Sequence, residues 1–344
     1  MKGSRYWRLW IGLALAGVLP PPANVSAQNA PLAYVSNERS GTVTIINTAT
    51  DKVVGTIEVG PGPRGIQVSP DGKRVYVALS DLAREVETDA DAIAEIDVAS
   101  GKITRRIRAG SDPEQFAVSP DGLKLFASNE DAGTASIIAL DAEEVIATLT
   151  VGIEPEGVAI SPDGRWVYVT AETSNTVSVI DTHANRVVAS FLVDVRPRAA
   201  AFSPDGKRAY VTSEISGTVS VVDTETHQVI ETILLEDGEA KPVGVVVSPD
   251  GKRVYVANGH ANSVSVIDAE THKVIATIRV GRRPWGLAIT PDGKKLYTAN
   301  GVSNDVSVID TSTNRVIATV KVDGEGPWGV AIANPSGGQL TQTR

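Results

Sequence analysis

The stretch SPDGRWVYVTAETSNTVSVIDTHANRVVAS, residues 161–190, contains the pattern that decides the fold of this chain. It begins with a Ser-Pro-Asp-Gly turn, continues as an apolar strand through Tyr168, and passes through a polar loop into the alternating strand 176–180. Proline presets φ for a type I turn, aspartate bonds nearby backbone amides, and glycine accepts the positive φ that follows. The stretch therefore predicts a tight turn followed by short β-strands.

The same pattern recurs along the chain. Its aromatic residue occurs seven times, at intervals of 42, 50, 42, 42, 45 and 42 residues: Tyr34, Tyr76, Phe126, Tyr168, Tyr210, Tyr255 and Tyr297. Its turn begins at Ser69, Ser119, Ser161, Ser203, Ser248 and Thr290. Each copy supplies four short strands, and no helical periodicity is present. The sequence predicts an all-β protein, a seven-bladed β-propeller with four-stranded antiparallel blades.

The position of the strand before each turn predicts how the ring closes. That strand occurs seven times, at residues 65–68, 115–118, 157–160, 199–202, 244–247, 286–289 and 329–332. The chain enters the repeat at its aromatic strand, so the first copy lacks this leading strand and the last copy has a surplus one. We expect the C-terminal strand to complete the first blade, which removes free sheet edges. A single propeller then spans residues 28–334, followed by a flexible tail, 335–344.

Composition and the N-terminal segment predict an exported protein. Lys2, Arg5 and Arg8 precede an apolar run, 9–19, that is too short to span a bilayer, and a small-residue pattern ends at Ala27. We therefore predict a signal peptide, 1–27, and no transmembrane helix. Its removal changes the net charge from −9 to −12, which argues against nucleic-acid binding. The 344 residues include no cysteine, which excludes disulfides, thiolate metal sites and covalently attached haem.

The repeat resembles a known family. The segments Tyr168-Val169-Thr170 and Tyr255-Val256-Ala257-Asn258, with the recurrent Val-Ser-Val-Ile-Asp-Thr, look like YVTN β-propeller repeats over residues 31–334. Segments such as Pro113-Glu114-Gln115-Phe116 and Pro327-Trp328-Gly329 resemble the group of PQQ-dependent catabolism-associated β-propeller proteins. This resemblance implies a periplasmic protein linked to pyrroloquinoline-quinone-dependent alcohol oxidation, and a quinoprotein dehydrogenase or a cytochrome as its partner. An extracellular or cell-surface location is the alternative, and we expect a monomer.

Loops at one face of a propeller converge on the mouth of its channel, and these loops carry many charges. The loops that enter the innermost strands contribute Arg64, Asp112, Glu114, Glu154, Glu156, Arg196, Arg198, Lys241, Arg282, Arg283, Trp285 and Trp328. The loops that follow the second strands contribute Glu38, Asp81, Glu130, Glu172, Glu214, His260 and Asn304. The mouth is predicted to be divided, with an acidic arc over the third and fourth repeats facing a basic arc from Arg196 to Arg283.

This mouth suggests a binding site for a planar anion or a partner loop. We select as binding residues Arg64, Glu114, Glu130, Glu156, Glu172, Arg198, Lys241, His260, Trp285 and Trp328. Guanidinium groups bind carboxylates in two-point geometry and indoles stack on flat rings, so pyrroloquinoline quinone, a flat tricarboxylate, fits. The structural alternative is that these charges pair across blades and that the two tryptophans fill space between them.

Two further groups of residues have weaker metal-binding patterns. The long loop of the second repeat carries acids at every second position, and its residues Glu87, Asp89 and Asp91 are candidate Ca²⁺ ligands. A solvated acidic loop, or one that receives a basic partner such as a cytochrome, is the alternative. His260 is the one histidine near the mouth that could ligate haem iron.

The sequence contains no local motif for a nucleophile with its base, a metal cage or a protected carboxylate pair, so we select no catalytic residue. We therefore expect a non-enzymatic binding or adaptor protein. One alternative is a metal-dependent hydrolase or lactonase, with acids such as Glu114, Glu130, Glu156 and Glu172 around an ion at the mouth. The other is a cell-surface adhesion or scaffold protein.

Overall fold

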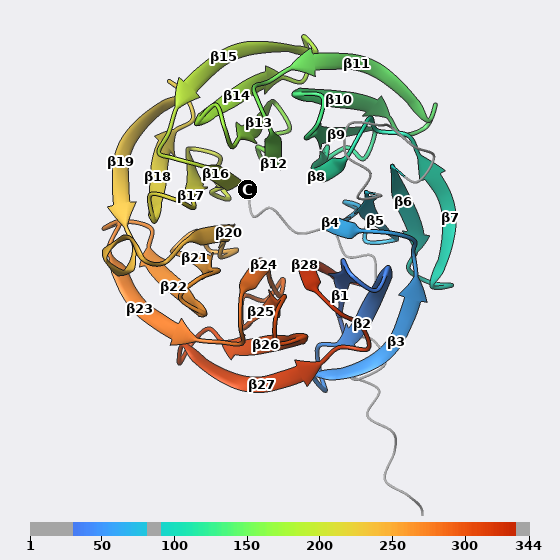
Figure 1. Cartoon of the computed structure of the whole chain (residues 1–344), viewed down its shortest axis with the longest axis vertical. Helices are drawn as coiled ribbons and strands as arrows, with labels where there is room; N and C mark the ends of the chain where they lie inside the picture. The colour runs from blue at the N-terminus through green and yellow to red at the C-terminus, as the bar shows by residue number, and fades with distance from the viewer. Residues whose placement is uncertain (1–29, 81–90, 335–344) are drawn as a thin grey trace, which may run out of the picture.

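The computed structural model describes residues 30–80 and 91–334, which form a ring of seven four-stranded antiparallel sheets around a central channel (Figure 1). The predicted all-β seven-bladed propeller is confirmed. The predicted signal peptide, 1–27, and C-terminal tail, 335–344, lie outside the described residues. In the described part of the chain the one helical element is the 3-10 helix η1 (Glu236–Gly238), and no helix there is long and apolar enough to cross a membrane.

Each blade has four strands, which succeed one another from the channel outwards. The innermost strands are β28 (Pro327–Ala333), β4 (Pro63–Val68), β8 (Pro113–Val118), β12 (Pro155–Ile160), β16 (Pro197–Phe202), β20 (Pro242–Val247) and β24 (Pro284–Ile289). The second strands are β1 (Leu32–Asn37), β5 (Arg74–Leu79), β9 (Lys124–Asn129), β13 (Trp166–Ala171), β17 (Arg208–Ser213), β21 (Arg253–Asn258) and β25 (Lys295–Asn300). The third strands are β2 (Thr42–Asn47), β6 (Ala92–Asp97), β10 (Thr134–Ala139), β14 (Thr176–Asp181), β18 (Thr218–Asp223), β22 (Ser263–Asp268) and β26 (Asp305–Asp310). The outermost strands are β3 (Lys52–Glu58), β7 (Lys102–Ile107), β11 (Glu144–Thr150), β15 (Arg186–Leu192), β19 (Gln228–Leu234), β23 (Val274–Arg279) and β27 (Arg315–Lys321).

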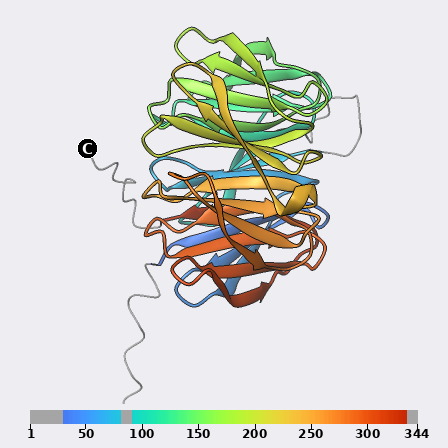
Figure 2. The ribbon, with the colours of Figure 1, turned by 90° about the vertical axis from the view of Figure 1, so that its left-hand side faces the viewer.

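The first blade joins the two ends of the described chain. Strand β28 pairs antiparallel with β1, from Leu32 opposite Ala333 to Asn37 opposite Pro327. The predicted closure of the ring by the C-terminal strand is confirmed. The start of β1 and the end of β28 therefore lie on the same face of the disc, which Figure 2 shows from its side.

The core lies between neighbouring blades. Each of the seven repeat aromatics lies on a second strand and is at most 5% exposed. In one interface, Tyr34 and Val43 of the first blade pack with Val75 and Val77 of the second. The outermost strands instead alternate between exposed and half-buried residues, as in β15. Burial of both faces of the inner strands explains why their sequences are almost continuously apolar.

A proline begins every innermost strand of the described blades: Pro63, Pro113, Pro155, Pro197, Pro242, Pro284 and Pro327. Proline lacks an N–H group and suits the first residue of an edge strand, so it starts each strand at the same level of the channel. The residues that follow these prolines are structurally equivalent, and we call them the inner ring: Arg64, Glu114, Glu156, Arg198, Val243, Trp285 and Trp328.

Candidate active site

A cavity of about 770 Å³ lies at the mouth of the channel, where the innermost strands begin. Eight of the ten predicted binding residues line it: Arg64, Glu114, Glu130, Glu156, Glu172, Arg198, Trp285 and Trp328. Because these residues come from six blades, only the ring brings them together. The ring of blades thus forms one site from positions scattered over most of the sequence.

Lys241 does not line this cavity, which corrects its selection from the sequence. It precedes Pro242, so the inner-ring position of its blade belongs to Val243. The Lys241 ammonium group instead donates a hydrogen bond to the carbonyl oxygen of Ile215, 3.0 Å away. The blade therefore contributes no cation to the cavity lining.

His260 is also absent from the lining, and its side chain is exposed. The N–H group of Glu172 donates to the carbonyl of Glu154, and the corresponding bond in the His260 blade is donated by Gly259 to Lys241. The residue equivalent to Glu172 is therefore Gly259, and His260 lies one position further along the loop. Sequence reasoning placed the histidine one residue out of register.

The candidate Ca²⁺ ligands fall in two parts of the chain. Glu87 and Asp89 lie outside the described residues. Asp91 is buried and lines the mouth cavity. A Ca²⁺ site in this segment stays a prediction.

Paired loops hold the mouth side chains in place. The residue before each proline of the innermost strands has a positive φ, for example 46° at Asp112, 54° at Glu154 and 64° at Arg196. Its carbonyl accepts a hydrogen bond from the residue that follows the second strand, as Asp112 does from Glu130. This conformation is uncommon for residues other than glycine, and such positions cluster at functional sites. The repeated bond sets Glu130, Glu172 and their equivalents beside the inner ring.

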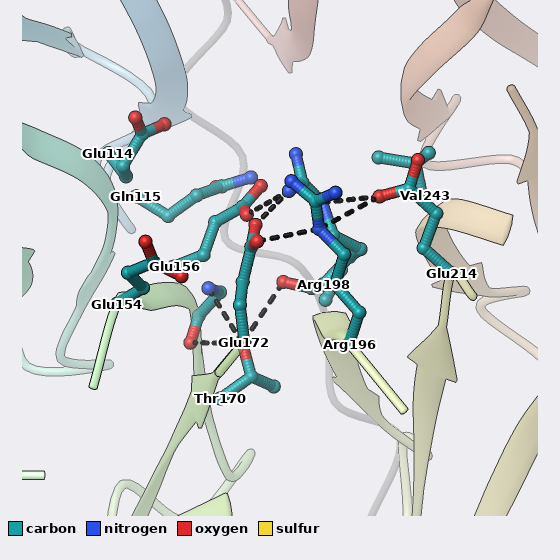
Figure 3. A network of polar contacts seen from close by, with 12 residues as sticks. Glu114, Gln115, Glu154, Glu156, Thr170, Glu172, Arg196, Arg198, Glu214 and Val243 are labelled. Carbon is teal, nitrogen blue, oxygen red and sulfur yellow. Dashed lines mark hydrogen bonds and ion pairs between the residues drawn. The ribbon is translucent and has the colours of Figure 1, made fainter. Parts of the chain in front are cut away.

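Arg198 is the centre of the first ion-pair cluster (Figure 3). It is buried, and its Nη1 atom lies 2.8 Å from a carboxylate oxygen of Glu156 and also pairs with Glu172. Its Nε atom lies 3.7 Å from the carboxylate of Glu214. Arg196 contacts two of the same acids, Glu172 at 2.7 Å and Glu214 at 3.4 Å. Two guanidinium groups therefore share three carboxylates contributed by two blades.

Arg64 forms an equivalent cluster across the channel. It contacts Glu38 at 2.9 Å and Asp112 at 3.3 Å, and it pairs with Glu114. Burial opposes its charge, but the carboxylates of Asp112 and Glu38 outweigh that effect and raise the pKa of Arg64. Ser80, which sequence reasoning did not select, donates a hydrogen bond to Asp112. Its position after the second strand of its blade, equivalent to that of Glu172, was the available signal.

Trp285 and Trp328 stack on one another, with ring centroids 5.8 Å apart and planes 17° from parallel. The guanidinium carbons of Arg198 and Arg283 lie 5.1 and 4.9 Å from the Trp285 ring. A Cβ atom at Gly301 would lie 2.9 Å from the indole, so only glycine permits this approach. The tryptophans fill the space beside the arginines, as the structural alternative predicted, and their faces are already in contact with protein groups.

The cavity is acidic overall, which corrects the expectation of a divided mouth. Among the described lining residues nine carry carboxylates and three carry guanidinium groups. The carboxylates belong to Glu38, Asp91, Asp112, Glu114, Glu130, Asp131, Glu154, Glu156 and Glu172. The guanidinium groups belong to Arg64, Arg196 and Arg198, each paired with two or three of the mouth acids. Within the described lining no basic arc faces the acids, so this lining disfavours an anion such as pyrroloquinoline quinone.

Glu156 has the most perturbed carboxyl group in the cavity. Burial raises its pKa to about 7, since Arg198 only partly compensates it and the carboxylates of Glu130 and Glu214 act in the same direction as burial. Its carboxylate is 2.8 Å from Arg198, yet that guanidinium also serves Glu172. The effect of burial on the pKa exceeds that of Arg198, because the site has fewer cations than acids. At neutral pH this carboxyl group therefore exchanges between its two protonation states.

Glu130 lies near two other acids. Burial, together with the charge of Asp112, raises the pKa of Glu130 against the effect of Arg64. One oxygen each of Asp112, Glu114 and Glu130 lie within 4.8 Å of one another. Asp112 and Glu114 already pair with Arg64, so this cluster has a cation of its own.

Comparison with family models gives two partial matches. Residues 188–331 match the model "Lactonase, 7-bladed beta-propeller", and residues 23–193 match the "Choice-of-anchor I domain". No curated protein matches the chain. The matched range of the lactonase propeller model includes the mouth residues Arg196, Arg198, Trp285 and Trp328.

Solved propeller structures resemble the whole ring. Hydrazine synthase from Kuenenia stuttgartiensis has a TM-score of 0.69 and 25% identity, with 80% of this chain and 91% of that chain covered. A candidate 6-phosphogluconolactonase from Bacteroides uniformis has a TM-score of 0.75 and 21% identity, with 89% and 100% covered. A second such candidate, from Bacteroides fragilis, has a TM-score of 0.73 and 20% identity, with 91% and 100% covered. At 21% and 20% identity, the similarities to the two Bacteroides proteins establish the fold alone.

These matches correct the expected function. The sequence pattern predicted a non-enzymatic adaptor of quinone-dependent oxidation, and that prediction is wrong. The partial match to the lactonase model favours instead the hydrolase alternative that the acids of the mouth had suggested. Sequence reasoning kept the hydrolase only as an alternative because the acidic residues have no local motif and meet only in the ring.

Proposed function

We propose that this chain is a lactonase-like hydrolase that opens a cyclic ester bound in the mouth cavity. The observation that carries the proposal is the carboxyl group of Glu156, which lies in the cavity wall beside Arg198 and has a pKa raised to about 7. A general base is most effective when its pKa lies near the working pH. The match of residues 188–331 to a lactonase propeller supports the same reaction class.

The reaction adds water across the ester bond of the ring. Ionised Glu156 accepts a proton from a water molecule while the water oxygen forms a bond to the carbonyl carbon. The bond between that carbon and the ring oxygen then breaks. Glu156 returns the proton to the ring oxygen, and the product is an open-chain hydroxy acid. One carboxyl group thus acts first as base and then as acid, which a pKa near neutrality permits.

Arg198 serves two purposes in this scheme. Its Nη1 atom pairs with Glu156 and Glu172 and so fixes the position of the base. Its guanidinium group also lines the cavity, and we assign it as the donor for the carbonyl oxygen of the lactone. Negative charge develops on that oxygen in the transition state, and a fixed guanidinium group stabilises it in a water-poor site.

The carboxylates of Asp112, Glu114 and Glu130 do not fit a resident divalent cation. Two of them pair with Arg64, whose positive charge lies where a cation would have to bind. The mechanism therefore includes no metal-dependent step. Arg64 instead reduces the repulsion among these acids and keeps the wall of the cavity folded.

The test is hydrolysis of γ-butyrolactone and glucono-δ-lactone by the purified protein, followed by titration of the released acid after subtraction of the spontaneous rate. Glu156→Gln should lower kcat by about 100-fold or more, the usual contribution of a general base. With the wild-type protein, kcat/KM should rise about tenfold per pH unit below pH 7 and level off above it, because only ionised Glu156 accepts the proton. A chelator should have no effect.

Glu225→Gln is the matched control, because Glu225 is exposed in the turn between β18 and β19. Its activity should equal that of the wild type. A Glu156→Gln protein with wild-type activity would exclude Glu156 as the base. Absence of hydrolysis by the wild type of any lactone in a broad panel would exclude the function itself.

A further inference from the structure

The charge of the mouth cavity determines which lactones can enter it. Nine carboxylates of the described chain line it: Glu38, Asp91, Asp112, Glu114, Glu130, Asp131, Glu154, Glu156 and Glu172. The cations of the described lining are three arginines, and no lysine lines the cavity. The cavity therefore has an excess of negative charge at neutral pH, even with Glu156 partly protonated.

The lining arginines are already engaged by carboxylates, and Arg196 is the exposed one of the three. Arg64 contacts three carboxylates, Arg198 contacts three and Arg196 contacts two. At Arg64 or Arg198 a phosphate group would have to displace a carboxylate from a largely buried guanidinium and leave that carboxylate uncompensated. Breaking a buried pair in this way is strongly unfavourable. At exposed Arg196 the phosphate group would compete with Glu172 and Glu214.

Two further cations of this face, Lys241 and Arg283, lie outside the cavity lining. Lys241 binds the carbonyl of Ile215, and exposed Arg283 lies against the ring of Trp285. Inside the cavity the described lining thus presents an anion with nine carboxylates and three paired guanidinium groups. A cleft lined by one sign of charge also raises the local concentration of ligands of the opposite sign.

We infer that the substrate is a lactone that carries no phosphate or carboxylate group, either neutral or bearing an amine. This inference rests on the proposed function and adds the substrate class. It separates this chain from a 6-phosphogluconolactonase-type activity, whose substrate bears a phosphate. The same charge has a consequence for turnover: hydrolysis converts a neutral ring into a carboxylate, which the acidic lining repels, so inhibition by the product should be weak.

Two matched pairs of substrates test the inference. The first pair is glucono-δ-lactone and 6-phosphoglucono-δ-lactone, which differ in the phosphate. The second is γ-butyrolactone and α-amino-γ-butyrolactone, which differ in the amine. We expect kcat/KM to be about tenfold or more lower for the phosphorylated member of the first pair, and equal or higher for the aminated member of the second below the pKa of its amine.

Two further measurements show whether charge is the cause. Raising the sodium chloride concentration should increase kcat/KM for the phosphorylated lactone and decrease it for the aminated one, because salt screens both effects. Glu154→Gln, which removes one exposed lining carboxylate, should improve the ratio of phosphorylated to unphosphorylated hydrolysis by about two- to threefold.

The outcomes separate the inference from the function on which it rests. Hydrolysis of the phosphorylated lactone at an equal or higher kcat/KM overturns the substrate class and leaves the hydrolase intact. Hydrolysis of none of the four compounds overturns both. The unphosphorylated lactone could also be preferred to an extent that neither salt nor Glu154→Gln changes. The selectivity would then come from the shape of the cavity, which would overturn the electrostatic inference.

Discussion

Glu156 shows how the surroundings of one residue change its chemistry. In an unfolded chain its carboxyl group has an ordinary pKa of 4.5, and in the folded ring burial raises that pKa to about 7. Arg198 lies 2.8 Å away but is shared with Glu172 and Glu214, so it compensates each acid only in part. A poorly compensated carboxyl group reduces stability in its charged form, and the proposed reaction depends on that same property.

This perturbed pKa predicts a pH-dependent loss of stability. Because the folded state holds the proton of Glu156 more tightly than the unfolded state, the stability it contributes is complete below pH 4.5 and is lost as the pH rises through 7. Glu156→Gln removes this titration. Near pH 8 the variant should therefore have a free energy of unfolding higher than that of the wild type, by on the order of 2 kcal/mol, and the difference should shrink towards pH 4.5.

Chemical denaturation of both proteins between pH 4.5 and 8 measures this difference. Glu225→Gln again provides the comparison. Its free energy of unfolding should depend on pH in the same way as that of the wild type. Parallel curves for wild type and Glu156→Gln would show that the carboxyl group has an ordinary pKa in the fold.

The element that repeats most faithfully is the Ser-Pro-Asp-Gly turn. In the fifth blade the Ser203 hydroxyl donates to Asp205 at 2.6 Å and accepts from the N–H group of Arg208 at 3.0 Å. Asp205 also accepts from the N–H group of Lys207 at 3.1 Å. Its hydrogen bond with Ser203, more than any other contact, lowers the pKa of Asp205. The turn therefore satisfies the polar groups that the chain exposes on passing from β16 to β17.

Removal of one such hydroxyl should be measurable. Ser203→Ala removes a buried hydroxyl and leaves the N–H group of Arg208 and the carboxylate of Asp205 without this partner. It should lower the free energy of unfolding by about 1 to 2 kcal/mol. Ser190→Ala, at an exposed position of β15, should change it by less than about 0.5 kcal/mol. Equal effects in the two variants, measured by urea denaturation, would mean that water replaces the turn hydrogen bonds at no cost.

At the scale of the whole molecule, stability depends on how the ring closes. Strand β28 supplies the innermost strand of the first blade and pairs with β1 along its length. The seventh blade also reaches the first from outside the channel: Lys295 donates to Asp51 at 2.7 Å, and the Tyr297 hydroxyl donates to the same side chain at 2.5 Å. Contacts between the two ends of the chain thus complete a structure whose blades otherwise contact only their neighbours.

This closure predicts the effect of truncation. A chain that ends at Glu325 lacks β28, exposes the edge of β1 and removes Trp328 from the mouth. It should therefore lose cooperative thermal unfolding and the proposed lactonase activity together. A chain that ends at Asn334 retains all of β28 and should keep the Tm of the full-length protein within about 2 °C. A cooperative transition at an unchanged Tm in the shorter chain would contradict closure by this strand.

The sequence by itself determined the all-β class, the seven blades and the strand that closes them, because turn chemistry and strand period are local and repeat seven times. It also identified eight of the mouth residues, since equivalent repeat positions face the channel together. It misplaced Lys241 and His260, because a shift of one or two residues in a loop changes which side chain faces inwards. Only the tertiary structure decided that Arg64 and Arg198 are each surrounded by acids from neighbouring loops. The net charge of the cavity and the pKa of Glu156 follow from those distances and from burial, which no single repeat contains.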